Sequence, residues 1–186
     1  MQTADLWLLQ AAYAGAAGRA WLDVILLITF LGSGWMLIAL VPLLFWSKVR
    51  ARAAALLVTL AVTSGVVASA KALACRVRPC HALGWTRSLP IELPTDPSFP
   101  SGHAAGSFAF AAFIFAWNRR AGLALGAVAT LVALSRVALG VHYPSDVTAG
   151  AILGAALGAI GARVSARAGS SSTVGLADAD TESVGQ

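Results

Sequence analysis

The feature that most constrains this chain is a succession of long apolar segments separated by short basic gaps. A helix of about 20 apolar residues spans the roughly 30 Å hydrocarbon core of a bilayer. The chain is 58% hydrophobic and 11% charged, whereas soluble domains carry about 25% charged residues. Because so few polar groups cannot cover a folded surface, we predict an all-α fold, a polytopic transmembrane helical bundle with about five spans. The expected spans are 21–46, 53–74, 101–117, 121–141 and 144–164.

The segments outside these spans differ in composition. Residues 2–19 mix aromatic and small side chains, which favours an N-terminal helix lying at the membrane interface. Pro42 is expected to kink the first span near its end. Residues 75–100 hold most of the prolines and should form an ordered loop outside the lipid. We expect a membrane domain over 1–167 and a disordered tail over 168–186, which has no apolar period.

Glycines recur at a spacing of four in the last span, at Gly150, Gly154 and Gly158. Small residues at this spacing let two helix backbones approach closely within lipid. A glycine-rich phosphate loop is the alternative, and it is disfavoured because the segment is apolar and helical. We therefore predict a close helix–helix contact on this face.

Basic residues fall in the gaps that lie on one side of a five-span bundle. Cytoplasmic loops carry the excess of Lys and Arg in membrane proteins. We therefore expect an integral protein of the cell (inner) membrane, with the C-terminal tail in the cytoplasm and the long loop on the other side. The net charge of +5 fits this topology better than a nucleic-acid groove, so no nucleic-acid partner is expected. The basic residues are Lys48, Arg50, Arg52, Arg119, Arg120, Arg163 and Arg167.

Three short polar segments map to the opposite, non-cytoplasmic side. The first runs Lys71-Ala-Leu-Ala-Cys-Arg-Val-Arg78-Pro79. Lys71 lies at the end of an apolar span, where burying an ammonium group is costly. The segment can bind an anion, or it can be a snorkelling lysine followed by a positive loop.

The second segment is Pro100-Ser101-Gly102-His103, at the start of the third span. A proline in the first turn of a helix leaves N–H groups, here those of Ser101 and Gly102, that face an anion bound at the helix N-terminus. His103 can exchange a proton with a leaving oxygen. An ordinary capped helix with an interfacial histidine is the alternative.

The third segment is Ser135-Arg136-Val-Ala-Leu-Gly-Val-His142-Tyr-Pro-Ser-Asp146. Arg136 lies within an apolar span, where its charge needs a partner or an anion. Asp146 can reach back to His142, as the acid of a capping box does. A carboxylate on one ring nitrogen leaves the other free to attack, although a purely structural His–Asp pair has the same pattern.

Taken together, these three segments indicate a site that binds a phosphoryl group. Ionisable groups within a membrane are functional by default. Several cations and a helix N-terminus at one membrane face suit a transition state that spreads negative charge over equatorial oxygens.

The same segments resemble the signatures of the type 2 phosphatidic acid phosphatase family, which read K-x6-R-P, P-S-G-H and S-R-x5-H-x3-D. Every signature position is matched, and the order and spacing agree over about residues 21–165. The resemblance implies a helical membrane core with the active site at one membrane surface. It also implies that no metal or other cofactor is needed, and the sequence offers no Asp/Glu cluster to hold one.

The resemblance implies a role for each signature residue. His142 is similar to the family's nucleophile, which becomes a phosphohistidine, and Asp146 to its orienting partner. His103 resembles the acid that protonates the leaving group. The residues that resemble the family's phosphate cradle are Lys71, Arg78, Ser101, Gly102 and Arg136.

The expected function is that of an integral membrane lipid phosphatase that hydrolyses a phosphate monoester or diphosphate. Candidate substrates are undecaprenyl diphosphate, phosphatidylglycerophosphate and phosphatidic acid. A lipid phosphotransferase and a non-catalytic membrane scaffold are alternatives, but a scaffold predicts loss of the histidines and the aspartate. Vanadium haloperoxidases hold vanadate in a similar constellation, yet they are large soluble proteins, which five spans disfavour.

Cys75 and Cys80 lie on either side of Arg78 in the long loop. An oxidising outer compartment would permit a disulfide between them. Their spacing permits this bond without requiring it.

Overall fold

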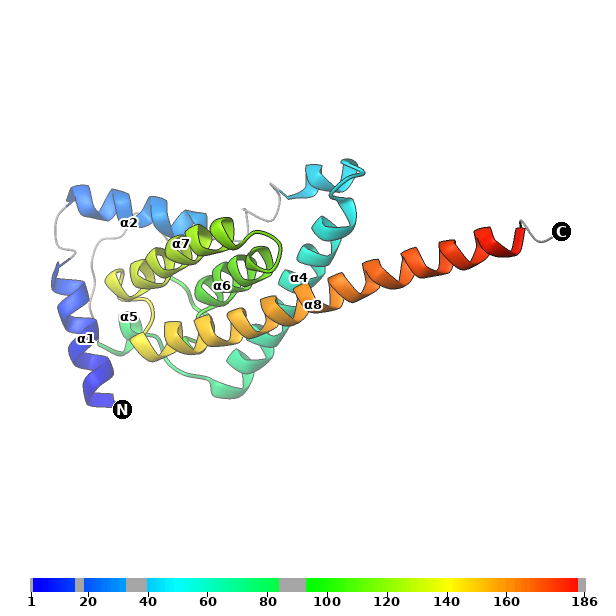
Figure 1. Cartoon of the computed structure of the whole chain (residues 1–186). Helices are drawn as coiled ribbons and strands as arrows, with labels where there is room; N and C mark the ends of the chain where they lie inside the picture. The colour runs from blue at the N-terminus through cyan, green and yellow to red at the C-terminus, as the bar shows by residue number, and fades with distance from the viewer. Residues whose placement is uncertain (1, 16–18, 33–39, 84–92, 184–186) are drawn as a thin grey trace.

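The computed structural model describes residues 2–15, 19–32, 40–83 and 93–183, and the regular structure in these ranges is helical (Figure 1). The predicted all-α class is therefore confirmed. The elements are α1 (Gln2–Gly15), α2 (Arg19–Leu31), the 3₁₀ helix η1 (Val41–Phe45), α4 (Arg50–Ala74), α5 (Pro79–Ala82), α6 (Gly102–Phe115), α7 (Arg119–Ala138) and α8 (Pro144–Ser183).

Local sequence signals account for the ends of the long helices. Asn118 caps α7 by accepting a hydrogen bond from the N–H of Ala121 at 3.0 Å. Pro144 occupies the first position of α8, where its missing N–H has no intrahelical partner. Helix α4 stops at Cys75, which is left-handed with φ 46° and donates its N–H to the carbonyl of Lys71. That turn redirects the chain toward the start of α8.

Three helical segments in the described part of the chain are long and apolar enough to cross a membrane. They are Arg50–Ala82, which joins α4 and α5, Arg119–Ala138 and Pro144–Ala168. Two shorter apolar helices, Leu22–Leu31 and Gly102–Phe115, accompany them. The predicted polytopic transmembrane helical bundle is confirmed, and the chain is an integral membrane protein.

The outer faces of these helices carry large apolar side chains that have no protein neighbours to cover them. Leu73 is 87% exposed and Ile152 67% exposed, with similar residues along α4, α7 and α8. A soluble monomer rarely shows so much contiguous apolar surface. Lipid is the solvent that these faces fit.

The first predicted span differs from the structure. Helix α2 ends at Leu31, residues 33–39 lie outside the described part, and Pro42 sits in the first turn of η1 instead of kinking a long helix. Proline is tolerated where a helix begins and is excluded from its interior, which fits the position of Pro42 at the start of η1.

The division into a membrane domain over 1–167 and a disordered tail over 168–186 stays a prediction. Helix α8 continues to Ser183, and Figure 1 shows its last part extending beyond the other helices. No proline follows Pro144, so no residue removes an N–H donor from the helix beyond that point.

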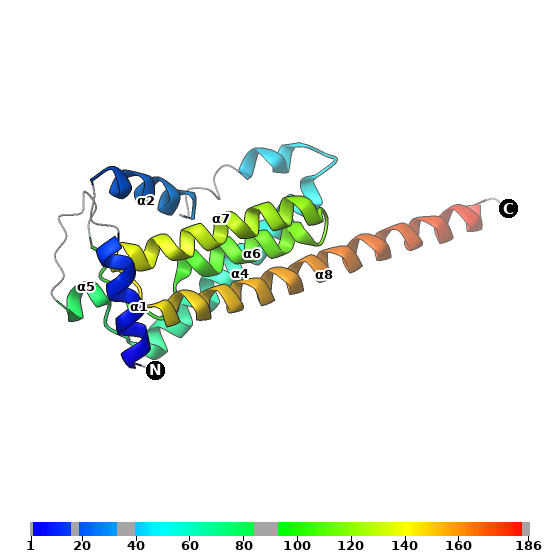
Figure 2. The ribbon, with the colours of Figure 1, turned by 60° about the vertical axis from the view of Figure 1, so that its left-hand side comes forward.

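Helix α6 forms the centre of the bundle and packs against α4, α7 and α8, while α2 packs against α7. Figures 1 and 2 show α1 lying across the end of the bundle at which α8 begins. The predicted N-terminal helix is present there. Several of the buried residues of α6 are small, with Ala104, Ala105 and Ala109 all 0% exposed.

The predicted glycine contact joins α8 to α6. A Cβ atom placed on Gly154 would lie 2.0 Å from the carbonyl oxygen of Ala105, and one on Gly158 would lie 2.2 Å from that of Ala109. One on Gly150 would lie 2.5 Å from the carbonyl oxygen of Ser101. The glycines therefore let the two backbones touch, as small residues do within lipid.

We expect Gly154→Ala to destabilise the protein, because the added methyl group would force the backbones of α6 and α8 apart. Overpacking of this kind costs about 1–3 kcal/mol. Thermal unfolding in detergent should show a lower midpoint than the wild type. Gly126→Ala in α7 is the matched control, because a Cβ there meets no atom within 4 Å. Equal midpoints for both variants would contradict the close-contact interpretation.

Candidate active site

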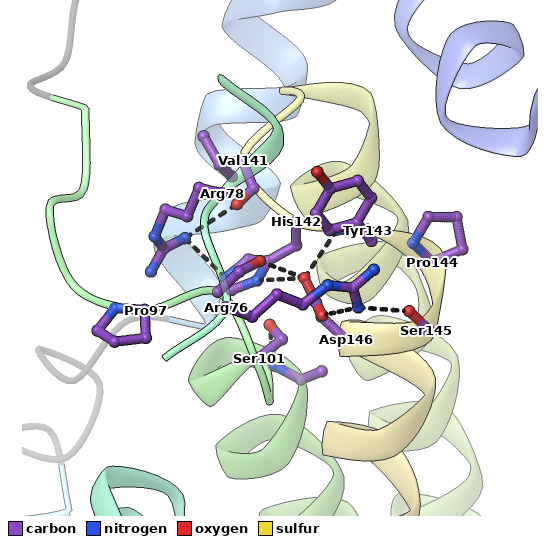
Figure 3. A network of polar contacts seen from close by, with 12 residues as sticks. Arg76, Arg78, Pro97, Ser101, Val141, His142, Tyr143, Pro144, Ser145 and Asp146 are labelled. Carbon is purple, nitrogen blue, oxygen red and sulfur yellow. Dashed lines mark hydrogen bonds and ion pairs between the residues drawn. The ribbon is translucent and has the colours of Figure 1, made fainter. Parts of the chain in front are cut away.

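The three signature segments meet at one end of the bundle, where the linker after α4 passes between the start of α6 and the α7–α8 turn (Figure 3). The first comes from the end of α4 and the start of α5, the second from the start of α6, and the third from the end of α7 through the start of α8. Residues far apart in the chain are thus brought together at one surface of a membrane bundle.

His142 and Asp146 form a buried pair, with 2% and 0% of their surfaces exposed. Nδ1 of His142 lies 3.5 Å from Oδ2 of Asp146. Oδ2 accepts hydrogen bonds from the N–H of Tyr143 at 2.9 Å and from the hydroxyl of Ser98. As predicted, Asp146 reaches back over the start of its own helix like a capping-box acid.

The other ring nitrogen of His142 faces Arg78. Nη1 of Arg78 lies 3.1 Å from Nε2 of His142 and donates a hydrogen bond to the carbonyl of Val141 at 3.0 Å. Arg78 is itself only 4% exposed. A guanidinium group held by the main chain therefore lies beside Nε2 of His142, the ring nitrogen that does not face Asp146 (Figure 3).

Asp96 bridges the two cations of the first signature. Its Oδ1 accepts a hydrogen bond from Nη2 of Arg78 at 2.8 Å, and its Oδ2 pairs with the ammonium of Lys71. The neighbouring main chain contributes too, because Nε of Arg78 donates to the carbonyl of Asp96 at 2.7 Å and Lys71 donates to that of Pro97 at 2.6 Å. The loop before α6 is thus fastened to the end of α4.

Arg76 supports the His–Asp pair from the opposite side. Its Nη1 donates to Oδ1 of Asp146 and to the hydroxyl of Ser145, both at 2.7 Å, and its guanidinium lies 4.0 Å from the ring centroid of Tyr143. Asp5 of α1 pairs with Nη2 of Arg76 at 3.1 Å and accepts the N–H of Ser145 at 2.9 Å. Helix α1 is therefore ionically bound to the start of α8.

The start of α6 partly differs from expectation. Ser101 is the N-cap of α6 and Pro100 precedes it, so the proline lies outside the first turn. The N–H of Ser101, predicted to face an anion, donates instead to the main-chain carbonyl of Asp146 at 3.0 Å. This bond joins the second signature to the third, and the hydroxyl oxygen of Ser101 accepts from the N–H of Ala104 at 3.5 Å as the cap of α6.

Arg136 and His103 complete the set. Arg136 is 4% exposed in the last turn of α7, and its Nε is a buried nitrogen without a hydrogen-bond partner among the described residues. A buried donor left unpaired costs free energy, which an anionic ligand would recover. His103 is the second residue of α6. Its ring lies close enough to Arg136, His142, Arg78 and Lys71 to interact with their charges.

The His142 imidazole is neutral at physiological pH. Burial lowers its pKa to about 4, the Asp146 carboxylate opposes this shift, and the charges of Arg78 and Arg136 add to it. A neutral imidazole keeps one nitrogen lone pair available.

Three further features bear on the candidate site: metal-binding groups, the two cysteines and the cavity. Among the described residues, no three His, Cys, Asp or Glu side chains gather in a metal-binding group. Cys75 and Cys80 are both free thiols, the first exposed and the second buried. A cavity of about 880 Å³ between α4 and α8 is lined by Arg52 and Trp117, at the opposite end of the bundle from the signature residues.

Sequence reasoning missed Asp5, Arg76 and Asp96. An acid within an otherwise apolar N-terminal helix is a signal for Asp5, because a charge at the membrane needs a partner. Arg76 lies inside the first signature but at one of its unspecified positions. Asp96 lies in the loop without any periodic pattern that would assign it a partner.

Comparison with known proteins gives one family of membrane phosphatases. Residues 52–170 match the family described as the PAP2 superfamily. The chain is 36% identical over 128 residues to the decaprenylphosphoryl-5-phosphoribose phosphatase of Mycobacterium tuberculosis, covering 68% of this chain and 69% of that protein. Its fold is similar to that of a transmembrane PAP2-type phosphatidylglycerolphosphate phosphatase from Bacillus subtilis, with TM-score 0.76, 24% identity and coverage of 89% and 86% of the two chains. It is also similar to LpxE from Aquifex aeolicus, with TM-score 0.70, 26% identity and coverage of 85% and 94%.

We expect Arg76→Gln to lower stability, because the fully buried Asp146 would lose a charged partner and α1 would lose its link to α8. A hydrogen bond to a charged group contributes about 1.5–3 kcal/mol, so the thermal midpoint in detergent should fall by several degrees. Arg120→Gln removes an exposed arginine at the other end of the bundle and should leave the midpoint near that of the wild type. If the two variants melt together, the Asp5–Arg76–Asp146 network does not support the fold.

Proposed function

Because this chain belongs to the PAP2 superfamily and is a membrane phosphatase, we propose that it hydrolyses a lipid phosphate through a phosphohistidine on His142. The observation that carries the proposal is the buried His142–Asp146 pair with Arg78 beside Nε2, the ring nitrogen that faces away from Asp146. These groups lie at the end of α4, the end of α7 and the start of α8, at one end of the bundle.

His142 is the nucleophile in this proposal. Its Nε2 attacks phosphorus, and the bond between phosphorus and the leaving oxygen breaks. Asp146, fixed by Tyr143 and Ser98, keeps the proton on Nδ1 and stabilises the positive charge that develops on the ring. Ring burial keeps the imidazole unprotonated before attack.

His103 moves the protons in both steps. It donates a proton to the departing oxygen as the phosphorus–nitrogen bond forms, and it becomes neutral. In the second step it accepts a proton from water, whose oxygen attacks phosphorus, and the bond to Nε2 breaks with its electron pair returning to the ring. Phosphate leaves, and both histidines regain their starting protonation states.

Protein cations carry the phosphoryl charge in both steps. Arg78 borders the attacking nitrogen, and the unpaired Nε of Arg136 is available to an equatorial oxygen. Lys71, the Ser101 hydroxyl and the Gly102 N–H complete the cradle. Aimed donors of this kind stabilise charge that develops in the transition state.

The proposed substrate class is a phosphate carried by a polyprenyl-linked lipid. The relative from Mycobacterium tuberculosis is a decaprenylphosphoryl-5-phosphoribose phosphatase, and its match extends over most of this chain. Undecaprenyl diphosphate, phosphatidylglycerophosphate and phosphatidic acid are the comparison substrates.

The proposed orientation places the site on the non-cytoplasmic side, with the C-terminal tail in the cytoplasm. Arg52 lies 4.2 Å from the ring centroid of Trp117 and Arg119 lies 5.5 Å from that of Phe115. The starts of α4 and α7 are thus basic at the end of the bundle opposite His142, and basic ends of membrane helices face the cytoplasm.

Purified protein in detergent and EDTA should release phosphate from a polyprenyl-linked substrate faster than from the comparison lipids.

His142→Ala should abolish both product and an acid-labile phosphoenzyme that is trapped by quenching at alkaline pH. His103→Ala should slow turnover by about 10²–10⁴, the usual contribution of a placed acid or base. Label on Ser101 or Ser135, or a strict requirement for Mg²⁺, would refute the mechanism.

The orientation can be tested by cysteine labelling in intact cells. In a background without Cys75 and Cys80, a membrane-impermeant maleimide should label Thr95→Cys, which lies in the exposed loop. Arg120→Cys, exposed at the start of α7, should react only after lysis. The reverse pattern would show that the site faces the cytoplasm.

A further inference from the structure

The carboxylate of Asp96 holds the same two cations that the proposed function assigns to the substrate phosphate. One oxygen pairs with Lys71 and the other accepts from Arg78 at 2.8 Å. A carboxylate spanning an ammonium and a guanidinium uses donors that two phosphoryl oxygens would use. Asp96 and a phosphate group therefore compete for one site.

The donor inventory shows how direct this competition is. An arginine has five N–H donors and a lysine three. Arg78 directs Nε and Nη1 to main-chain carbonyls and the His142 ring, while Nη2 binds the Asp96 carboxylate. Lys71 divides its donors between Asp96 and the carbonyl of Pro97. The contacts to the Asp96 side chain are the ones that an anion can take over without disturbing the main chain.

Exposure decides which partner can move. The side chain of Asp96 is 54% exposed, whereas those of Lys71 and Arg78 are 13% and 4% exposed. The carboxylate can therefore turn into water and be hydrated, while the cations stay in place. Burial raises the pKa of Asp96, but the hydrogen bond from Lys71 and the charge of Arg78 outweigh this and hold the pKa below its usual value. At neutral pH the competitor is fully ionised.

We infer that Asp96 is an internal competitor for the phosphate site: the substrate phosphate displaces its carboxylate from Lys71 and Arg78, and its return helps to expel the phosphate product. The inference rests on the proposed function and adds a residue outside the three signatures. A ligand that must first displace an internal group binds with an apparent affinity reduced by the fraction of open sites. Asp96 therefore weakens phosphate binding and opposes product inhibition.

A residue that merely positions Lys71 and Arg78 would have the opposite effect on phosphate binding. If Asp96 only held the cations in place, its removal would weaken phosphate binding. The sign of the change in the inhibition constant for inorganic phosphate therefore separates the two roles.

The test compares Asp96→Asn with the wild type, using inorganic phosphate as a competitive inhibitor of lipid phosphate hydrolysis. We expect the inhibition constant to fall about tenfold or more in Asp96→Asn and to stay near the wild-type value in Asp96→Glu, which keeps the charge. Thr95→Ala, an exposed neighbour in the same loop, is the matched control and should change nothing. An unchanged or higher constant in Asp96→Asn would overturn the inference. A wild-type protein that hydrolyses no lipid phosphate would refute the proposed function instead.

A second measurement uses the wild-type protein alone and does not depend on the folding of a variant. Carbodiimide with an amine modifies accessible carboxylates, and mass spectrometry locates the product. Adding inorganic phosphate should increase modification of Asp96, because the displaced carboxylate leaves its cation partners. Unchanged or reduced modification at saturating phosphate would contradict displacement.

Discussion

The contact between α6 and α8 is the constraint on which the site depends. Glycines on α8 let the two backbones touch, and the N–H of Ser101 donates to the main chain of Asp146 across that contact. The helix start that carries Gly102 and His103 is thereby held beside the turn that carries His142. No hydrophobic effect drives helices together within lipid, so packing and polar bonds must do so. The backbone separation of two helices thus sets the geometry of the chemistry.

The charges of the site also hold the protein together. A charge at the membrane is costly unless it is paired. Arg76 pairs with Asp5 of α1 and Asp146 of α8, and Arg78 pairs with Asp96 of the loop. Each pair joins segments that are distant in the chain, so α1 and the loop are attached through the electrostatics of the candidate site. Stability and the proposed chemistry consequently depend on the same carboxylates.

The sequence could predict the main helices because each carries its own boundary signals, such as Asn118 before α7 and Pro144 at the start of α8. The signature residues could be predicted for the same reason, since each signature is a local pattern. The partners of Asp5 lie 71 and 140 residues away, and no local period records such a pairing. The N–H of Ser101 was assigned to an anion because the sequence does not reveal that α8 supplies a carbonyl. Apolar content alone also could not reveal that α2 would end at Leu31.

The length of α6 sets the depth at which the reaction takes place. Its 14 residues span about 21 Å, whereas the hydrocarbon core is about 30 Å thick. Its far end lies near Trp117 and Arg119, aromatic and basic residues of the kind that occur at a membrane surface. A helix of this length does not reach from one surface of the hydrocarbon core to the other. Under the proposed function, the lipid phosphate would then reach the start of α6 just below the head groups while its tail stays in the bilayer.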